Sequence, residues 1–415
     1  MLTFIHAADI HLDSPLQGLL HYEGAPPIEE IRGATRQALD NLVNFALAEK
    51  VHFLLIAGDL YDGDWRDFNT GLYFAKQMRN LGEAGIRVAV VRGNHDAANT
   101  MTKTLVMPEN VKIFSSRKPE TWKLEDLGIA IHGQSYAIRD VYENLGILYP
   151  DPVPDFLNIG ILHCLISGAE GHLPYAPCTL DELAAKGYDY WALGHVHKFG
   201  VLRKQPHLVY AGCTQGRHIR EPGAKGCVLV EAEEGDIRTE FVPLDVLRWI
   251  EVKTDVSEAQ NIEQAAVAFG EKLKHAMSNL EGLNACVRVV LTGRCLGHGR
   301  LSADPEALAA NIRAVASEVS NGKAWIEKVQ LKTGPVIDFD GLAASDTPQG
   351  ELLRYLKELA ENSQAFEQVG LDTTALKSKI SGSGVEMQEE DAGKMLSDVR
   401  DILLTMLADE ESLEG

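Results

Sequence analysis

The sequence predicts an α/β protein in which layered, covered β-sheets alternate with helices along the chain. Over the first two hundred residues, short apolar runs alternate with amphipathic stretches, which is the order that strand–helix–strand units give. The length of 415 residues is sufficient for two or three domains. A hydrophobic share of 45% is ordinary for a globular chain, so disordered and fibrous classes are excluded.

Periodicity and length assign the elements of the first part. Three short, almost continuously apolar runs predict buried strands at residues 2–7, 51–57 and 87–91. Two stretches with apolar side chains at helical spacing predict helices at residues 31–50 and 68–81. Because strands and helices alternate, we expect both faces of the sheet to be covered.

Clusters of aspartate, asparagine, histidine and glycine follow five apolar strands. They supply the candidate metal ligands Asp9, His11, Asp59, Asn94, His163, His195 and His197. The carboxyl ends of strands in an open α/β sheet form the edge where ligands bind, so we expect these side chains to converge. A single histidine or Gly-Asp pair would be an ordinary strand end or helix cap, whereas five such clusters together predict a metal site.

The chemistry of this donor set favours two divalent cations. Carboxylate, amide and imidazole donors without thiolates suit Mn²⁺, Fe²⁺ or Zn²⁺, and we expect Mn²⁺. Asp59 stands between the other clusters and is the natural bridging carboxylate. Two cations about 3.5–4 Å apart can hold both oxygens of a phosphoryl displacement, and a water that bridges them is a credible nucleophile.

Taken together, the motifs resemble the signature of the calcineurin-like metallophosphoesterases. The matching motifs are Asp9-x-His11, Gly58-Asp59, Gly93-Asn94-His95-Asp96, His163 and Gly194-His195-x-His197. Residues 5–13 and 58–62 look like those of SbcD-type DNA repair nucleases, and residues 215–221 are most similar to the YhaO branch of that group. The resemblance covers residues 1–245 and implies a layered β-sandwich flanked by helices.

The resemblance implies a role for each metal-site residue. One cation would be held by Asp9, His11, Asp59 and His197, and the other by Asp59, Asn94, His163 and His195. His95 would not be a ligand but would protonate the leaving oxygen or stabilise the transition state, since an imidazole can act as a general acid near neutral pH. Asp96 is expected to orient the His95 ring, as carboxylates do around metal-site histidines.

Two segments are candidates for substrate contacts. Arg217, His218 and Arg220 belong to a basic run that either holds substrate phosphates or forms ordinary surface salt bridges. Trp65 and Arg66 stand where SbcD-like chains usually carry a Pro-Ser pair. They either stack on a splayed nucleotide or pack on their own domain.

Two further parts follow the phosphoesterase region. Residues 246–345 show a β-α-β-α-β order, and the resemblance implies a small α/β domain that caps the active site. Residues 346–415 predict a helical tail, with amphipathic helices at residues 351–361 and 390–407 and the polar linker 378–391 between them. In related nucleases such a tail binds an SbcC-type ATPase, so a YhaN-like ATPase is the expected partner. Helices that dock on their own chain are the equal alternative.

Composition limits the partners. The net charge is −21, so a phosphate-bearing substrate must be attracted by local cations or metal ions. No apolar run approaches the roughly 20 residues that span a bilayer, and the amino terminus lacks the pattern of a signal peptide. We therefore expect a cytoplasmic protein without a membrane partner. The 6 scattered cysteines, with no C-x-x-C pair, are expected to be reduced core thiols.

Three functions remain for the metal site. The leading hypothesis is a DNA exonuclease or endonuclease subunit of an SbcC–SbcD-like repair complex, with homodimerisation implied by the resemblance alone. The first alternative is a phosphoesterase for a small nucleotide or cyclic nucleotide, which the acidic charge favours. The second is a non-catalytic scaffold for an SMC-like ATPase. The complete ligand set counts against this scaffold, because a scaffold needs no metal donors.

Overall fold

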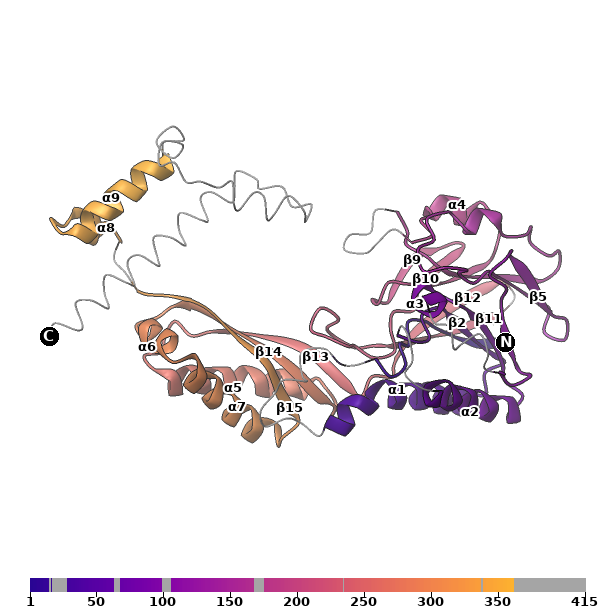
Figure 1. The fold of residues 1–415 in the computed structure, drawn as a ribbon, viewed down its shortest axis with the longest axis horizontal. Helices are drawn as coiled ribbons and strands as arrows, with labels where there is room; N and C mark the ends of the chain where they lie inside the picture. The colour runs from indigo at the N-terminus through magenta and orange to yellow at the C-terminus, as the bar shows by residue number, and fades with distance from the viewer. Residues whose placement is uncertain are drawn as a thin grey trace. The chain divides into compact units, whose positions relative to one another are not determined.

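The structure, a computed structural model, describes residues 1–14, 16, 28–62, 68–98, 106–167, 175–233, 235–336 and 339–361. The chain divides into two compact units (Figure 1). The first unit contains residues 1–251, 277–288 and 323–327, and the second contains residues 252–276, 289–322 and the described residues from 328 onward. The residues of the predicted metal site all belong to the first unit.

Two six-stranded sheets form the first unit. In spatial order, one sheet consists of β12 (Asp236–Pro243), β11 (Gly226–Glu233), β1 (Leu2–Ala7), β2 (Phe53–Ala57), β3 (Arg87–Val91) and β4 (Val111–Ile113). The other consists of β5 (Glu120–Leu124), β6 (Ile129–Gly133), β7 (Leu157–His163), β8 (Tyr190–Gly194), β10 (His207–Tyr210) and β9 (Gly200–Lys204). Side chains from both sheets share one buried core, in which Phe4 of β1 stacks on Phe53 and meets Tyr190 of β8 edge-on.

The central strands of each sheet are parallel, and this arrangement positions the site. β1, β2, β3 and β4 pair in parallel in one sheet, and β6, β7, β8 and β10 do so in the other. Parallel neighbours end at the same edge, so the polar residues after β1, β2 and β3 gather there. At the same place, His163 at the end of β7 reaches across to the carbonyl of Ala57 at the end of β2.

Helices cover the outer face of the first sheet. α1 (Ile28–Ala48) and α2 (Asn69–Glu83) run beside each other in Figure 1. Leu42 of α1 and Met78 of α2 pack in one core with Ile5 and Ile56 of the sheet. Burial of these side chains follows from the helical spacing of apolar residues that the sequence shows, because such a stripe is stable only against another apolar surface.

The outer face of the second sheet is covered by shorter elements. α4 (Leu180–Ala184) begins with a capping box between Thr179 and Glu182, and its Leu183 packs against Trp191 of β8. The 3₁₀ helix η2 (Gly146–Leu148) lies in the irregular segment that follows β6. These elements, together with the sheets and α1 and α2, confirm the prediction of a layered α/β fold with covered sheets.

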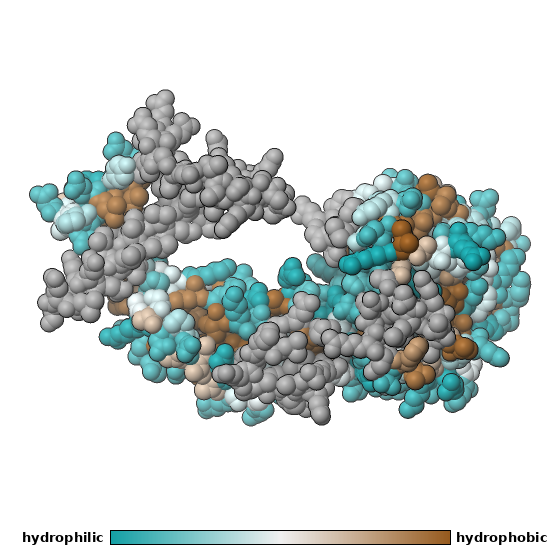
Figure 2. Space-filling model, in the orientation of Figure 1, coloured by the Kyte–Doolittle hydropathy of each residue, from teal (hydrophilic) through white to brown (hydrophobic). Residues whose placement is uncertain are grey.

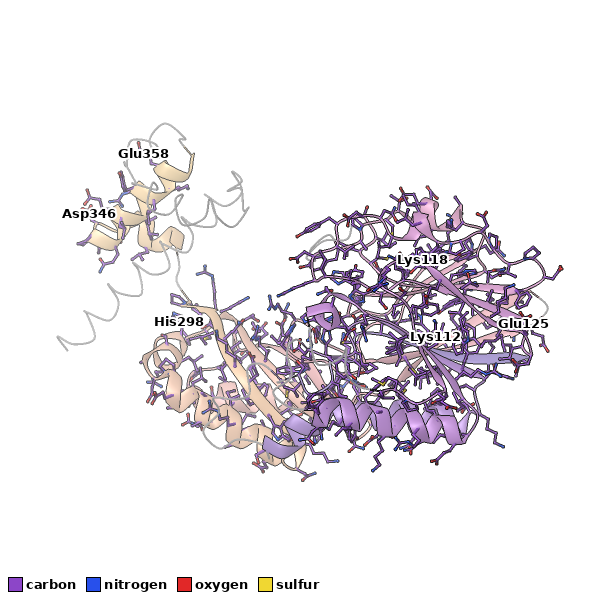
Figure 3. All side chains as sticks on the ribbon, turned by 45° about the vertical axis from the view of Figure 1, so that its right-hand side comes forward. Lys112, Lys118, Glu125, His298, Asp346 and Glu358 are labelled. Atoms are coloured by element: carbon purple, nitrogen blue, oxygen red, sulfur yellow. The ribbon has the colours of Figure 1, made fainter. Side chains whose placement is uncertain are left out.

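A third sheet, in the order β13-β14-β15, contains β13 (Leu247–Asp255), β14 (Asn284–Arg294) and β15 (Ala324–Gly334). The helices that follow its strands are α5 (Ile262–Ser278), α6 (His298–Ala303) and α7 (Pro305–Ser320). α7 begins as its sequence predicts, because the Asp304 side chain accepts the amide of Ala307 and a proline occupies the first turn. α6 was not expected. Its first residue, His298, is labelled in Figure 3, and its Nδ1 lies 2.9 Å from Thr333 Oγ1 of β15.

The described part of the tail ends in two helices. α8 (Phe339–Ala344) precedes α9 (Pro348–Glu361), and Asp346 and Glu358 mark this segment in Figure 3. Leu353 and Leu356 of α9 are buried, on the predicted apolar face. The predicted linker 378–391 and the predicted helix 390–407 lie outside the described residues. So do Trp65 and Arg66.

Two expectations from composition can be compared with the structure. None of the helices within the described ranges has both the length and the apolar composition that a membrane span requires. The cysteines at positions 164, 178, 213, 227, 286 and 295 are all free and buried. The Sγ atoms of Cys164 and Cys178 lie 3.5 Å apart, inside the core beneath α4.

Acid is expected to destabilise the fold through His6 of β1. Its Nε2 donates to the carbonyl of Leu193 at 3.2 Å, and its Nδ1 accepts from the hydroxyl of Tyr190 at 3.0 Å. Burial lowers the pKa of His6 from 6.5 to about 3. As the pH falls, the unfolded chain therefore binds a proton at His6 before the folded chain does. The stability that neutral His6 contributes is complete above the unfolded pKa and is lost as the pH falls toward 3.

Between pH 7 and pH 5 this loss is expected to be about 2 kcal/mol. His6→Gln keeps an N–H group but cannot titrate, so its free energy of unfolding is expected to fall by correspondingly less. Denaturant unfolding of both proteins at the two pH values measures the difference. The same pH dependence in both proteins would contradict the assignment.

Candidate metal centre

Left-handed turns place four of the predicted ligands at the ends of their strands. The backbone φ angles are +49° at Asp9, +45° at His11, +51° at Asp59 and +97° at His195. Aspartate and histidine enter this region more readily than most residues, at a cost of order 1–3 kcal/mol each. The turns after β1 and β2 are hydrogen-bonded to each other, because the amides of Asp9 and His11 donate to the carbonyls of Gly58 and Asp59 at 3.0 Å.

The first group of ligands contains Asp9, His11 and His197. The Nε2 atoms of His11 and His197 face each other at 3.2 Å, and His197 Nε2 lies 3.9 Å from Asp9 Oδ1. Burial, together with the charge of Arg217, lowers the pKa of His11 to about 3, so its imidazole is neutral at physiological pH. Two imidazole nitrogens and a carboxylate oxygen converge here, as they do around a metal ion.

The second group contains Asn94, His163 and His195. His163 donates from Nδ1 to the carbonyl of Ala57 at 2.9 Å, which directs its Nε2 toward Asn94 Oδ1, 3.0 Å away, and Asp59 Oδ2, 3.4 Å away. The rings of His163 and His195 lie 5.2 Å apart. Burial alone would lower the pKa of His163, but the carboxylates of Asp59 and Asp9 raise it to about 9. The same carboxylates would stabilise a metal cation.

Asp59 lies between the two groups. Its Oδ2 is 3.4 Å from His163 Nε2 and 3.9 Å from His11 Nε2, while its Oδ1 accepts the amide of His95 at 2.9 Å. Burial works against the charged form, but the surrounding histidines outweigh it and hold the pKa of Asp59 well below the usual range. A Cβ atom at Gly93 would collide with Asp59 Oδ1 and would lie 2.8 Å from His163 Nε2, so only glycine fits there.

The residues present fit two divalent cations. Sets of three possible ligands form at Asp9, His11 and His197 and at Asp59, His163 and His195. In both sets an imidazole bonds outward through Nδ1, to Glu221 or to Ala57, and this fixes the tautomer that leaves Nε2 for a metal. The structure thus brings all seven predicted ligands together, with Asp59 in the bridging position.

His95 lies beside the ligand groups, and its partner differs from the prediction. Its Nδ1 is 3.1 Å from Asp62 Oδ1, and its ring is 4.9 Å from that of His11. Burial disfavours the imidazolium, but its hydrogen bond to Asp62 and the charge of Asp59 outweigh burial and raise the pKa of His95. His95 is therefore suited to hold a proton near the ligands.

The prediction that Asp96 orients His95 is wrong in this structure. The Asp96 carboxylate accepts the amides of Leu60, Tyr61 and Gly93 at 3.0–3.1 Å, whereas the His95 ring contacts Asp62. Residue 96 lies in the short helix α3 (Asn94–Ala98), where neighbouring residues project in different directions. Asp96 therefore holds the two turns after β2 and β3 together, while Asp62 has the place beside His95.

Arg217 and Glu221 connect the partner of His95, the expected general acid, to the metal ligand His197. The Arg217 guanidinium lies between Asp62 Oδ1, 3.5 Å from Nη1, and Glu221 Oε1, 3.3 Å from Nη2. Glu221 also accepts His197 Nδ1 at 2.6 Å and the backbone amide of Arg217 at 2.8 Å. Burial disfavours its charge, but these partners keep the pKa of Glu221 well below the usual range.

The other predicted substrate contacts are placed differently. His218 lies 3.4 Å from Glu221 Oε1, on the side of the carboxylate network. Arg220 is exposed and forms no ion pair with any residue that the structure describes. Arg203 of β9, an earlier arginine of the basic run, pairs with Asp181 of α4. Within the basic run, only Arg217 contacts both Asp62, the partner of His95, and Glu221, the partner of His197.

Sequence reasoning gave no role to Asp62 or Glu221. Both stand inside motifs that the resemblance quotes, but both lie in loops, where no periodicity shows which way a side chain points. The signal that could have found them is chemical: metal-site histidines and catalytic imidazoles usually have a carboxylate behind them. A search for acidic residues near each cluster would have found both.

Loss of the Glu221 charge is expected to weaken metal retention. Glu221→Gln removes the charge of the acceptor that fixes His197, and partners of this type are worth about 10–100-fold in metal affinity. Competition with a chelator at neutral pH measures the change. The exposed Glu240 of β12 offers the control Glu240→Gln, which should retain metal as the wild type does. Equal retention by both variants would contradict the role.

Comparisons with known proteins bear on both parts of the chain. Residues 2–199 match the family of calcineurin-like phosphoesterases, and residues 249–334 match the middle domain of metallophosphoesterase YhaO. A protein described as the uncharacterized metallophosphoesterase YhaO, from Bacillus subtilis, is 41% identical over 298 residues, 70% of this chain and 72% of the relative.

The other matches cover only part of the chain or superimpose poorly on its structure. The DNA double-strand break repair protein Mre11 from Methanopyrus kandleri is 28% identical over 218 residues, 47% of this chain and 44% of that protein. Among solved structures, a dimetal phosphatase from Danio rerio overlaps with a TM-score of 0.36 and 12% identity, covering 57% of this chain and 98% of that one. The last overlap is too low to support a conclusion.

Proposed function

Because the chain belongs to the calcineurin-like metallophosphoesterase family, in its YhaO-type branch, we propose that it is a metal-dependent phosphodiesterase that cleaves DNA. The family binds a pair of metal ions. The single observation that carries the proposal is the contact of His95 with Asp62 at 3.1 Å, beside a carboxylate that lies between two ligand groups. A pure scaffold would not need a proton donor in that place.

The reaction follows from the positions of the residues. Two divalent cations would lower the pKa of a water and neutralise charge on the phosphate. Asp9, His11 and His197 would hold one, and Asn94, His163 and His195 the other, with Asp59 shared. His95, whose proton Asp62 stabilises, would protonate the leaving oxygen, and so avoid expulsion of an alkoxide. Arg217 would keep Asp62 ionised and aligned.

Two observations support DNA over a small substrate. A relative of the catalytic region is named as a DNA double-strand break repair protein, and the chain has a second unit beyond the catalytic one. The acidic net charge of −21 favours the alternative, a small nucleotide or cyclic nucleotide. We also propose that the protein works in the cytoplasm with an SbcC-like or YhaN-like ATPase bound through residues 346–415.

Hydrolysis with added Mn²⁺ tests the function. Purified protein is offered linear DNA and a small chromogenic phosphodiester, beside the variants Asp59→Ala and His95→Ala. Degradation of DNA that both variants lose is the expected result. Turnover of the small diester with DNA untouched would favour the small-substrate enzyme or a nuclease that needs its ATPase. No hydrolysis of either substrate, despite bound metal, would favour the scaffold.

A binding experiment tests the partner separately. The candidate ATPase is used as prey against the full chain and against a chain that lacks residues 346–415. Capture by the full chain only is the expected result, provided that both chains give the same melting temperature for the sheet units. Equal capture by both would place the contact elsewhere.

A further inference from the structure

A run of aromatic rings leads from the metal centre to the surface of the first unit. The ring of His195 lies 5.2 Å from that of His163 and 5.6 Å from that of Tyr175. Tyr175 lies in turn 6.1 Å from Tyr142, tilted by 34°. Tyr175 is buried, whereas Tyr142 is 61% exposed. The last ring of the run is therefore open to solvent, two rings away from a predicted ligand.

The segment that carries Tyr142 is held in place and is unusually apolar at its surface. Val141, Leu145 and Tyr149 anchor it in the core, and the hydroxyl of Tyr175 donates to Asp140 at 3.0 Å. Besides Tyr142, the large exposed side chains of this segment are Ile138, Ile147 and Leu148. Figure 2 shows hydrophobic surface in the region of α4. Lys186, two residues beyond the end of α4, donates to the carbonyl of Ile147. Exposed apolar side chains gathered on one anchored segment are a feature that binding surfaces share.

We propose that Tyr142 is a stacking platform for a nucleobase of the substrate strand, beside the phosphodiester at the metal centre. The proposal rests on the proposed function and names the part of the substrate that its site would recognise. The run of rings sets the distance: Tyr142 is two ring contacts from His195, within reach of a base one or two nucleotides from the cleaved bond. Any base offers a flat face, so such a platform is tolerant of sequence.

The charges around Tyr142 assign it to a base and not to the phosphate backbone. Two cations lie at this segment, Arg139 and Lys186, whose Nζ donates to the carbonyl of Ile147, and the exposed carboxylates of Asp140 and Glu143 balance them. A surface with this balance would not attract phosphates. Stacking on an exposed ring does not depend on charge, and it requires a base that is free to leave its pair. The substrate class is therefore single-stranded DNA or a frayed duplex end.

Substitution of Tyr142 tests the platform with the full chain and Mn²⁺. For a single-stranded oligonucleotide, Tyr142→Ala is expected to lower kcat/KM by about tenfold, mainly through KM, since stacking of one base is worth about 1–3 kcal/mol. Tyr142→Phe keeps the ring and should retain most of the activity. Turnover of the small chromogenic diester, which has no base, should be unchanged. Tyr355→Ala, which removes an exposed tyrosine of α9, is the matched control.

A series of oligonucleotides with one abasic position each gives a second readout that needs no variant. The wild type is expected to bind and cleave about tenfold more weakly when one position near the cleaved bond lacks its base, and Tyr142→Ala should show no such position. Equal loss on oligonucleotide and small diester would mean that Tyr142 acts by supporting Tyr175 and His195, and would overturn the proposal. An oligonucleotide activity that Tyr142→Ala leaves unchanged would also overturn it.

Failure of the proposed function gives a different pattern. If the wild type hydrolyses the small diester but no oligonucleotide, even with the candidate ATPase added, the DNA function itself is rejected, whatever the variants do. If the wild type cleaves oligonucleotides and is indifferent to every abasic position, the function stands and the platform is rejected.

Discussion

Asp59→Asn is expected to abolish phosphodiester hydrolysis and to lower the metal content from two ions toward one or none. Its carboxylate lies within 3.9 Å of imidazole nitrogens from both ligand groups, so a single charge serves both positions. Asparagine keeps the size of the side chain and an oxygen for the amide of His95 but offers one neutral donor. A loss of about 10³-fold or more in kcat/KM is expected, because stabilisation by the metal pair amounts to several kcal/mol.

Metal analysis of the purified variant, together with hydrolysis of the small diester, measures this result. Asp155 provides a matched control, because it is an exposed aspartate in a left-handed turn, with φ of +65°. Asp155→Asn should keep both metal content and activity. Full metal content in Asp59→Asn would show that the carboxylate does not bridge, and the assignment would have to be abandoned.

His95→Gln is expected to leave metal binding intact and to slow the cleavage of DNA by about 10²–10⁴-fold, the usual contribution of a general acid. The effect should depend on the leaving group. An alkoxide from a sugar needs a proton, whereas a nitrophenolate leaves readily without one, so the small chromogenic diester should lose far less activity than DNA. Comparison of the two substrates at one pH measures this difference. Equal losses on both would assign His95 to binding and not to proton transfer.

The partner of His95 can be tested in the same assay. Asp62→Asn removes the charge of the acceptor that contacts the ring at 3.1 Å and should reproduce part of the leaving-group dependence, with a loss of roughly 10–100-fold. Asp96→Asn should instead lower thermal stability, because Asp96 holds three backbone amides of the turns after β2 and β3. The reverse pattern would restore the role that the sequence alone assigns to Asp96.

The convergence of the ligands could be predicted from the sequence because it depends on topology. Asp9, Asp59 and Asn94 each follow a parallel strand, and parallel neighbours end at one edge whatever the loops do. The predicted strands 2–7 and 87–91 agree with β1 and β3 residue by residue, because a short buried apolar run has few alternatives.

What could not be predicted depends on contacts between distant segments or on loop paths. Leu2 pairs with Ala232 across the antiparallel contact of β1 and β11, and no local pattern specifies that neighbour. The partners of His95 and His197 are Asp62 and Glu221, in loops whose backbone does not repeat. α6 has only six residues, including a glycine, so its helical signal is too weak to distinguish from a loop.

The left-handed turns at Asp9, His11, Asp59 and His195 also limit how this site can evolve. Among side chains that bind metals, aspartate, asparagine and histidine are those that tolerate this backbone, whereas glutamate and cysteine tolerate it less well. A mutation that exchanges a ligand at these four positions must therefore remain within that small set or strain the turn. The backbone geometry thus favours the retention of oxygen and imidazole ligands during evolution. A thiolate ligand at these positions would be hard to reach by single substitutions.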